Sequence, residues 1–183
     1  MQNVYDFDDT IFNGDSSVRF WRFCFKNDIS LVRYIPKQLF GLLCYLLKLK
    51  NLTGCKEYFF SFLKGVKDPM RTVDAFCEQS KKRIKTWYLN QKSDNDIIIT
   101  ASPEFLVKGF FKDEHICVIG TTMDCETGKI SGPNCKGEEK VKRLHELFPD
   151  VKIDSFYSDS HSDDPLGNIS KNRYVGKFIK KWK

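Results

Sequence analysis

The chain has 183 residues, enough for one domain or for one domain with a smaller domain inserted into it. Hydrophobic residues make up 41% and charged residues 30%, which is ordinary for a soluble globular protein with a substantial core. Lys and Arg outnumber Asp and Glu by 30 to 24, but the surplus is spread along the chain. A net charge of +6 is compatible with anionic ligands or anionic lipid, and we predict no nucleic-acid partner.

The seven cysteines are odd in number and show no spacing typical of a zinc site. We therefore expect buried, reduced thiols. Three carboxylates occur by Asp9, and no charged-then-apolar signal segment precedes them. These features predict a cytoplasmic protein.

The first predicted strand, residues 4–7, leads directly into an acidic sequence, DFDDT. Side chains alternate along an extended chain, so Asp6 and Asp8 should point the same way. Two carboxylates this close repel each other, and a divalent cation is the usual compensation. An acidic turn exposed to solvent is the alternative interpretation.

Residues 16–91 interrupt the alternation of strand and helix with a series of helix-like patterns. We predict a small helical domain here, inserted into a core of residues 1–15 and 92–183. Residues 39–47 are apolar throughout, but these nine residues are too few to cross a membrane, which takes about 20. A buried helix is the favoured interpretation, and a helix on a membrane surface is the alternative. The aromatic residues of the insertion indicate core packing or, alternatively, an apolar groove for a lipid phosphate.

The remaining strands are predicted at residues 97–99, 116–119 and 153–157, with an edge strand at 173–175. Helical patterns cover residues 103–111 and 138–148, and residues 121–132 indicate a β-hairpin. This alternation predicts an α/β fold with a doubly wound parallel sheet. Ligands of such sheets bind beyond the carboxyl ends of the strands.

Three more polar clusters fall at predicted strand ends or helix starts. The Thr100 hydroxyl and nearby amides could hold a phosphate oxygen, although Ser and Thr also cap helices. The sequence NCKGEEKV holds Lys136 and Lys140, either of which could neutralise a carboxylate and a phosphoryl group. The sequence YSDSHSDD places Asp159 and Asp163 in a polar loop, where they could complete a cation site.

The order carboxylate, hydroxyl, lysine and acidic loop resembles the haloacid-dehalogenase-like (HAD) phosphatase superfamily, over essentially the whole chain. DFDDT is similar to its first motif, DxDxT, and IIITAS, CKGEEKV and YSDSHSD are similar to its second, third and fourth motifs. The helical insertion resembles a C1-type cap, and the hairpin resembles one in the phosphoserine-phosphatase-like (HAD-IB) branch. The resemblance implies a hydrolase that requires Mg²⁺.

The resemblance also implies roles for the motif residues. Asp6 would be the nucleophile, Asp8 the general acid and base, and Thr100 a ligand of a phosphoryl oxygen. Mg²⁺ would bind the Asp6 carboxylate, the Asp8 carbonyl and Asp159, with Asp163 steadying the metal shell.

The resemblance places the catalytic lysine in the third motif, where we prefer Lys140 to Lys136. Lys140 opens a predicted helix and is followed four residues later by an apolar residue, as in the family. The positions that would contact substrate are Asp15, Ala101 and Ser102. The sequence TASP departs from the Gly-Gly pair of phosphoserine phosphatases, so the substrate stays open.

The predicted reaction is hydrolysis of a small-molecule or lipid phosphate monoester through an aspartyl phosphate on Asp6. A phosphotransferase, or a phosphatase for a small metabolite such as phosphoserine, would use the same site. A non-catalytic protein that binds a phospholigand is the alternative from another class, but binding alone does not need the proton-transfer carboxylate Asp8. Peripheral membrane contact through the insertion belongs to the same prediction, and the oligomeric state is left open.

Overall fold

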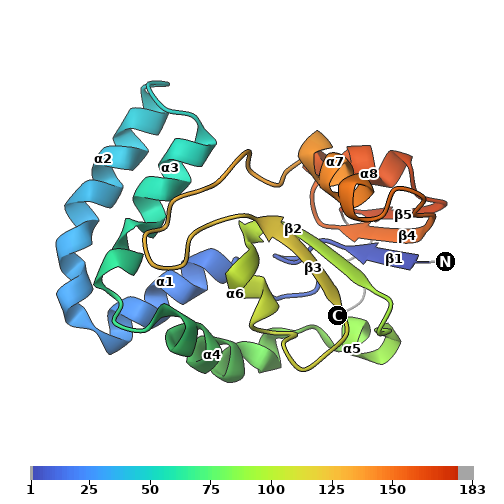
Figure 1. Ribbon diagram of the computed structural model, residues 1–183, viewed down its shortest axis with the longest axis horizontal. Helices are drawn as coiled ribbons and strands as arrows, with labels where there is room; N and C mark the ends of the chain where they lie inside the picture. The colour runs from blue at the N-terminus through green and yellow to red at the C-terminus, as the bar shows by residue number, and fades with distance from the viewer. Residues whose placement is uncertain (1, 177–183) are drawn as a thin grey trace.

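The computed structural model describes residues 2–176, in which five parallel strands form one sheet (Figure 1). The strand order is β3-β2-β1-β4-β5. The strands are β1 (Gln2–Tyr5), β2 (Ile97–Pro103), β3 (Cys117–Thr121), β4 (Ile153–Ser158) and β5 (Asn172–Val175). The predicted α/β class with a parallel sheet is confirmed, and the predicted edge strand is β5. Residues 177–183 of the predicted core lie outside the described part.

Both faces of the sheet are covered, because successive strand residues point to opposite sides. The helices of the core are α6 (Glu104–Lys108), α7 (Glu138–Leu147) and α8 (Asp164–Asn168). Val4, Ile97 and Ile99 pack with α7 and α8 in one buried cluster. Tyr5 and Ile98 belong to the second cluster, on the side of α6 and of α5 (Thr86–Gln91). This two-sided burial explains the uninterrupted apolar run Ile97–Ile99 at the start of the interior strand β2.

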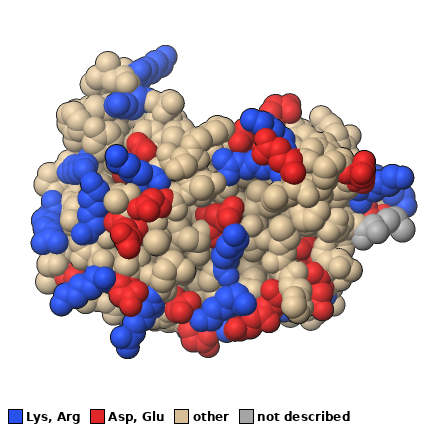
Figure 2. Space-filling view, in the orientation of Figure 1, with Lys and Arg blue, Asp and Glu red and all other residues tan. Residues whose placement is uncertain are grey.

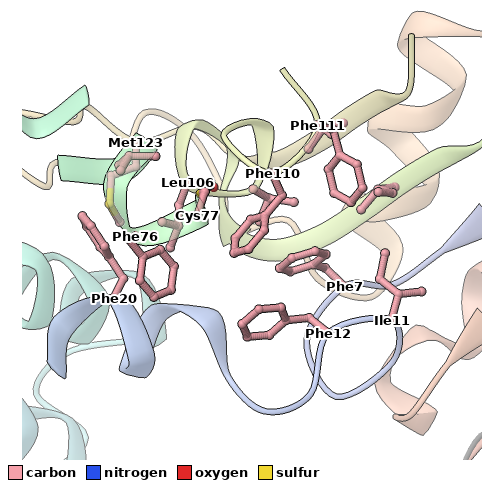
Figure 3. Close-up of a cluster of buried hydrophobic side chains, with 14 of the residues drawn as sticks. Phe7, Ile11, Phe12, Phe20, Phe76, Cys77, Leu106, Phe110, Phe111 and Met123 are labelled. Atoms are coloured by element: carbon pink, nitrogen blue, oxygen red, sulfur yellow. Dashed lines mark hydrogen bonds between the residues drawn. The ribbon is translucent and has the colours of Figure 1, made fainter. Parts of the chain in front are cut away.

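Strand β1 ends at Tyr5, two residues before the predicted end. The carbonyl of Phe7 accepts hydrogen bonds from the amides of Ile11 and Phe12, so the chain turns directly after the strand. Phe7 and Phe12 nevertheless insert into the core beside Phe110 (Figure 3). These apolar anchors hold a short polar loop against the carboxyl edge of the sheet.

Residues 16–91 form helices and 3₁₀ turns, as predicted. The α-helices are α1 (Ser16–Asn27), α2 (Ile35–Leu46), α3 (Leu52–Phe59), α4 (Pro69–Ser80) and α5 (Thr86–Gln91). The 3₁₀ segments of this region are η1 (Ile29–Tyr34), η2 (Phe60–Gly65) and η3 (Lys81–Arg83). A further 3₁₀ segment, η4 (His161–Asp163), belongs to the core. Phe20, Phe60, Phe62 and Phe76 are buried in one cluster with residues of the sheet core. Figure 3 shows Phe20 and Phe76 beside Leu106 and Phe110 of the core. Core packing therefore accounts for these aromatic residues.

The prediction of a buried helix at residues 39–47 is wrong. On α2 only Gly41 and Cys44 are buried, while the large apolar side chains are 40–67% exposed. A Cβ atom at Gly41 would lie 2.1 Å from Cβ of Tyr58, so the glycine lets α2 approach α3 closely. The two helices form an antiparallel pair at the end of the molecule far from β4 and β5 (Figure 1). No helix among the described residues is long and apolar enough to cross a membrane.

The predicted hairpin at residues 121–132 is present but short. One antiparallel bridge joins Met123 to Ile130, and the Asp124 amide donates to the Lys129 carbonyl at 2.8 Å. All seven cysteines are free, which agrees with the expected thiols. The expected burial holds for four of them, whereas Cys55, Cys117 and Cys125 are half-buried.

Candidate active site

The loop after β1 places Asp6 and Asp8 on the same side of the chain. Phe7, between them, is fully buried and stacks on Phe12 with ring centroids 5.1 Å apart. Both carboxylates therefore line a cavity of about 240 Å³ on the other side of the loop. The Asp6 amide donates to the Tyr157 carbonyl at 2.8 Å, which ties the start of the loop to β4.

Helix α7 delivers Lys140 to the same point. Gly137 precedes the helix with φ +61°, a conformation that other residues adopt only with strain, and Lys140 and Leu144 are both buried on one helix face. The Nζ atom of Lys140 donates to Oδ1 of Asp6 and to Oδ2 of Asp163, each at 2.7 Å. Burial acts to lower the pKa of Lys140, but the charges of these two carboxylates raise it above its ordinary value. Lys140 is therefore held as a cation between two anions.

The loop after β4 supplies Asp159 and Asp163. Asp163 is buried, and its Oδ2 accepts a hydrogen bond from Ser158 Oγ at 2.9 Å, whereas its Oδ1 has no hydrogen-bond partner among residues 2–176. The Asp159 amide donates to Thr10 Oγ1 at 2.9 Å, which joins this loop to the loop after β1. Burial raises the pKa of Asp159 to about 6, and the charges of Asp6 and two other aspartates add to the effect.

Asp8 lies in different surroundings from Asp6. Its carboxylate accepts hydrogen bonds from the Ser16 amide at 2.6 Å and from the Ser102 hydroxyl. Burial raises the pKa of Asp8 to about 7, although the serine hydrogen bonds act to lower it. A substantial fraction of Asp8 is therefore protonated near neutral pH, whereas Asp6 is paired with a lysine. Burial also raises the pKa of Asp6, and Lys140 opposes that shift.

The structure brings most of the predicted substrate-binding residues to this cavity. Thr100 is buried and its Oγ1 accepts a hydrogen bond from the Ser102 amide at 3.1 Å. Ser102 itself does not line the cavity but holds Asp8 in place. Asp15 caps α1 by accepting an amide hydrogen bond at 2.8 Å and also lines the cavity. The predicted residues that line the cavity are Asp6, Asp8, Asp15, Thr100, Ala101, Lys136, Lys140, Asp159 and Asp163.

Four cavity residues were missed by the sequence analysis: Asp9, Leu52, Lys56 and Asn134. Lys56, on α3, donates from Nζ to the Ala101 carbonyl at 2.9 Å and to Asn134 Oδ1 at 2.6 Å. Burial lowers the pKa of Lys56. The only sequence signal was a single cation on an apolar helix pattern, which does not indicate a contact with β2. Lys136, the alternative third-motif lysine, lies on the cavity wall without the buried contacts of Lys140.

The residues of this cavity fit the predicted Mg²⁺. The site is rich in negative charge, as the raised pKa of Asp159 reflects, and Oδ1 of Asp163 is buried without a partner. Within residues 2–176, no three His, Cys, Asp or Glu side chains stand close enough together to hold a metal ion on their own. Mg²⁺ prefers oxygen ligands and takes few protein carboxylates together with water and substrate phosphate. Asp6 and Asp159 with a backbone carbonyl would meet that preference.

Comparisons with known proteins agree with the fold and with the family that the sequence resembles. Residues 4–167 match the family model for haloacid dehalogenase-like hydrolases. Protein CicA of Caulobacter vibrioides (strain NA1000 / CB15N) is 28% identical over 188 residues, covering 93% of this chain and 83% of that protein.

Two solved structures are similar in fold. A Bordetella pertussis Tohama I protein with unknown function has a TM-score of 0.62 at 16% identity, covering 91% of this chain and 86% of that one. A phosphoserine phosphohydrolase-like protein from Francisella tularensis subsp. tularensis SCHU S4 has a TM-score of 0.57 at 10% identity, covering 99% of this chain and 90% of that one. At these identities the likeness concerns the fold alone.

Proposed function

Because the chain belongs to the haloacid dehalogenase-like hydrolase family, we propose that it hydrolyses a phosphate monoester of a small molecule or a lipid through an aspartyl phosphate on Asp6. One observation carries the proposal. Asp6 and Asp8 line one cavity in contrasting surroundings, with Asp6 paired to Lys140 and Asp8 hydrogen-bonded to neutral serine groups. Paired carboxylates in contrasting environments are the usual basis for dividing nucleophile and acid roles.

The first chemical step would be attack of an Asp6 carboxylate oxygen on phosphorus. A bond forms between phosphorus and that oxygen, and the phosphorus–ester oxygen bond breaks. Protonated Asp8, with a pKa raised to about 7, gives its proton to the leaving oxygen. In the second step Asp8 takes a proton from a water molecule that attacks phosphorus, and the bond to Asp6 breaks to release inorganic phosphate.

The main catalytic requirement of such a reaction is positive charge placed beside the transferring phosphoryl group, where it neutralises the negative oxygens. Lys140 supplies one fixed cation beside Asp6. Bound Mg²⁺, held by Asp6, the Asp8 carbonyl and Asp159, would neutralise further charge on the carboxylates and the phosphoryl oxygens. Thr100, which lines the cavity, would donate its hydroxyl to one of those oxygens.

Residues 16–91 would act as a cap over this site. The support is Lys56, which reaches from α3 to the Ala101 carbonyl at the end of β2, and Leu52, which lines the cavity one turn earlier. A cap in this position holds the leaving group and limits the access of water. Replacement of Lys56 by Met keeps the apolar stem but removes the ammonium group, so KM for a bulky phosphate monoester should rise while kcat for p-nitrophenyl phosphate changes little. Steady-state kinetics on both substrates test this role, and an equal loss in kcat for both would contradict it.

The central test of the proposed function is the variant Asp6→Asn, which keeps the side-chain shape but removes the nucleophilic charge. Turnover of p-nitrophenyl phosphate, with Mg²⁺ present, should fall to background. Beryllium fluoride, an acyl-phosphate mimic, should protect the unaltered protein against thermal unfolding and should leave Asp6→Asn unprotected. Turnover clearly above background in the variant would exclude Asp6 as the nucleophile.

A further inference from the structure

The α2–α3 pair carries an exposed apolar surface. Of the 16 large hydrophobic side chains that are exposed within residues 2–176, 11 lie between Ile29 and Leu52. Leu39, Leu43 and Leu46 recur at helical spacing on α2 and are 60%, 52% and 67% exposed. A continuous apolar surface of this kind marks an interaction site rather than scattered surface residues.

The same segment is positively charged. Residues 29–56 contain five of the 30 Lys and Arg residues and none of the 24 Asp and Glu residues, so 25 basic residues face 24 acidic ones in the rest of the chain. The segment thus accounts for five of the six net positive charges. Lys48 and Lys50 lie in the turn that joins α2 to α3. Figure 2 shows basic side chains at the projecting end of the molecule, above a flank of uncharged surface.

The shape of α2 limits what can cover it. Its 12 residues span about 18 Å, less than the roughly 30 Å of a bilayer core, so the helix cannot cross a membrane. It packs on α3 where Gly41 and Phe40 both meet Tyr58, while Leu39, Leu43 and Leu46 stay exposed and free to enter a second phase. An amphipathic or apolar helix flanked by cations lies in the plane of a membrane interface.

We propose that the α2–α3 pair docks this protein on the surface of an anionic lipid bilayer. The leucines of α2 enter the boundary between headgroups and acyl chains, while Lys48 and Lys50 bind lipid phosphates. A second copy of the chain fits this surface less well, because any pairing of two such segments brings cations against cations. Docking does not depend on the proposed hydrolysis, since the leucines of α2 and the lysines Lys48 and Lys50 do not line the candidate active site.

The position of the surface gives the docking a consequence for the site. Leu52 and Lys56, on the same α3 helix, line the catalytic cavity. A second pocket of about 550 Å³ lies between the α2–α3 turn and the loop at Pro133. Docking through α2 would therefore also fix the position of α3, the helix that contributes Leu52 and Lys56 to the cavity.

The test is sedimentation with vesicles of phosphatidylcholine alone and of an equal mixture with phosphatidylglycerol, at low and moderate salt. We expect binding to the mixed vesicles that weakens with salt, because salt screens the lysine–phosphate attraction. The double variant Leu39→Glu/Leu46→Glu should bind at least about tenfold more weakly, since burial of even one leucine is worth that factor. Leu147→Glu, at a site 59% exposed on α7, is the matched control and should bind like the unaltered protein.

Further measurements keep the outcome decisive. Circular dichroism and p-nitrophenyl phosphate turnover check that the leucine variants are folded, and inactive Asp6→Asn should bind vesicles normally. Absence of binding at both salt concentrations would overturn the proposal, as would equal binding by the double variant. A dimer in analytical ultracentrifugation that the double variant abolishes would also overturn it and would assign the surface to a second copy.

Discussion

Removal of the buried lysine gives the sharpest test of the site. Lys140 is 1% exposed and donates to Asp6 and Asp163, each at 2.7 Å. Its replacement by Ala leaves two buried carboxylates without their cation. Removing one partner of a buried ion pair costs about 3–5 kcal/mol of unfolding free energy. Loss of a charge-stabilising group at a reacting centre lowers kcat by a factor on the order of 10²–10³.

Both effects are measurable with matched variants. Lys136→Ala removes a lysine from the wall of the same cavity, one without the buried contacts, and should change kcat only a few-fold and stability by less than about 1 kcal/mol. Urea unfolding gives the free energy of unfolding of each variant. Turnover is measured without urea, after circular dichroism has shown that the variant is folded. In the double variant Lys140→Met/Asp163→Asn, one of the two carboxylates left without a cation is also removed. Its free energy of unfolding should therefore be higher than that of Lys140→Ala, whereas its kcat should stay as low.

Two outcomes would refute this reasoning. A larger loss of kcat in Lys136→Ala than in Lys140→Ala would mean that Lys136 is the charge-stabilising lysine. Recovery of kcat together with stability in the double variant would mean that Lys140 serves the fold and not the reaction.

Two further predictions concern proton transfer and the metal. Asp8→Asn should lower kcat for an alkyl phosphate by about 10²–10⁴-fold but lower release of p-nitrophenolate much less, because that group leaves without a proton. The same variant should accumulate phosphorylated protein, visible as a mass increase, and equal losses on both substrates would argue against Asp8 as the acid. Exhaustive chelation by EDTA should abolish turnover, Mg²⁺ should restore it, and Ca²⁺ should inhibit because it takes looser, higher coordination. Full turnover after chelation would contradict the predicted Mg²⁺ requirement.

The fold was accessible from the sequence because its signals are local. Most strands contain a short run rich in β-forming apolar residues, and the polar clusters follow those runs closely. Since parallel strands present their carboxyl ends at one edge, the order of the runs was enough to bring Asp6, Thr100 and Asp159 to one cavity. The pairing of Lys140 with a buried leucine one turn later is also a local pattern.

Two features depended on tertiary contacts that no local pattern encodes. Lys56 reaches Ala101 across 45 residues and Asn134 across 78, so its place in the site follows only once α3 is docked on the core. The exposure of α2 was misjudged for a related reason. An apolar run predicts that a helix seeks an apolar environment, but whether protein or lipid supplies that environment depends on what packs beside it. Here α3 packs on α2 at Gly41 and Trp21 of α1 bonds to Gln38, but the leucines of α2 stay 47–67% exposed.

The contrast between Asp6 and Asp8 shows how neighbouring residues of one motif come to differ. Because side chains alternate along the chain and Phe7 is buried on one side, both carboxylates line one cavity on the other side. Different helices and strands contact each of them there. Helix α7 brings a cation to Asp6, whereas the start of α1 and the end of β2 bring only amide and hydroxyl donors to Asp8. Asp8 is thus stabilised less as an anion, and burial raises its pKa to about 7. The proposed division of labour between a nucleophile and a proton donor would therefore follow from which elements reach the loop, because the two side chains are chemically identical.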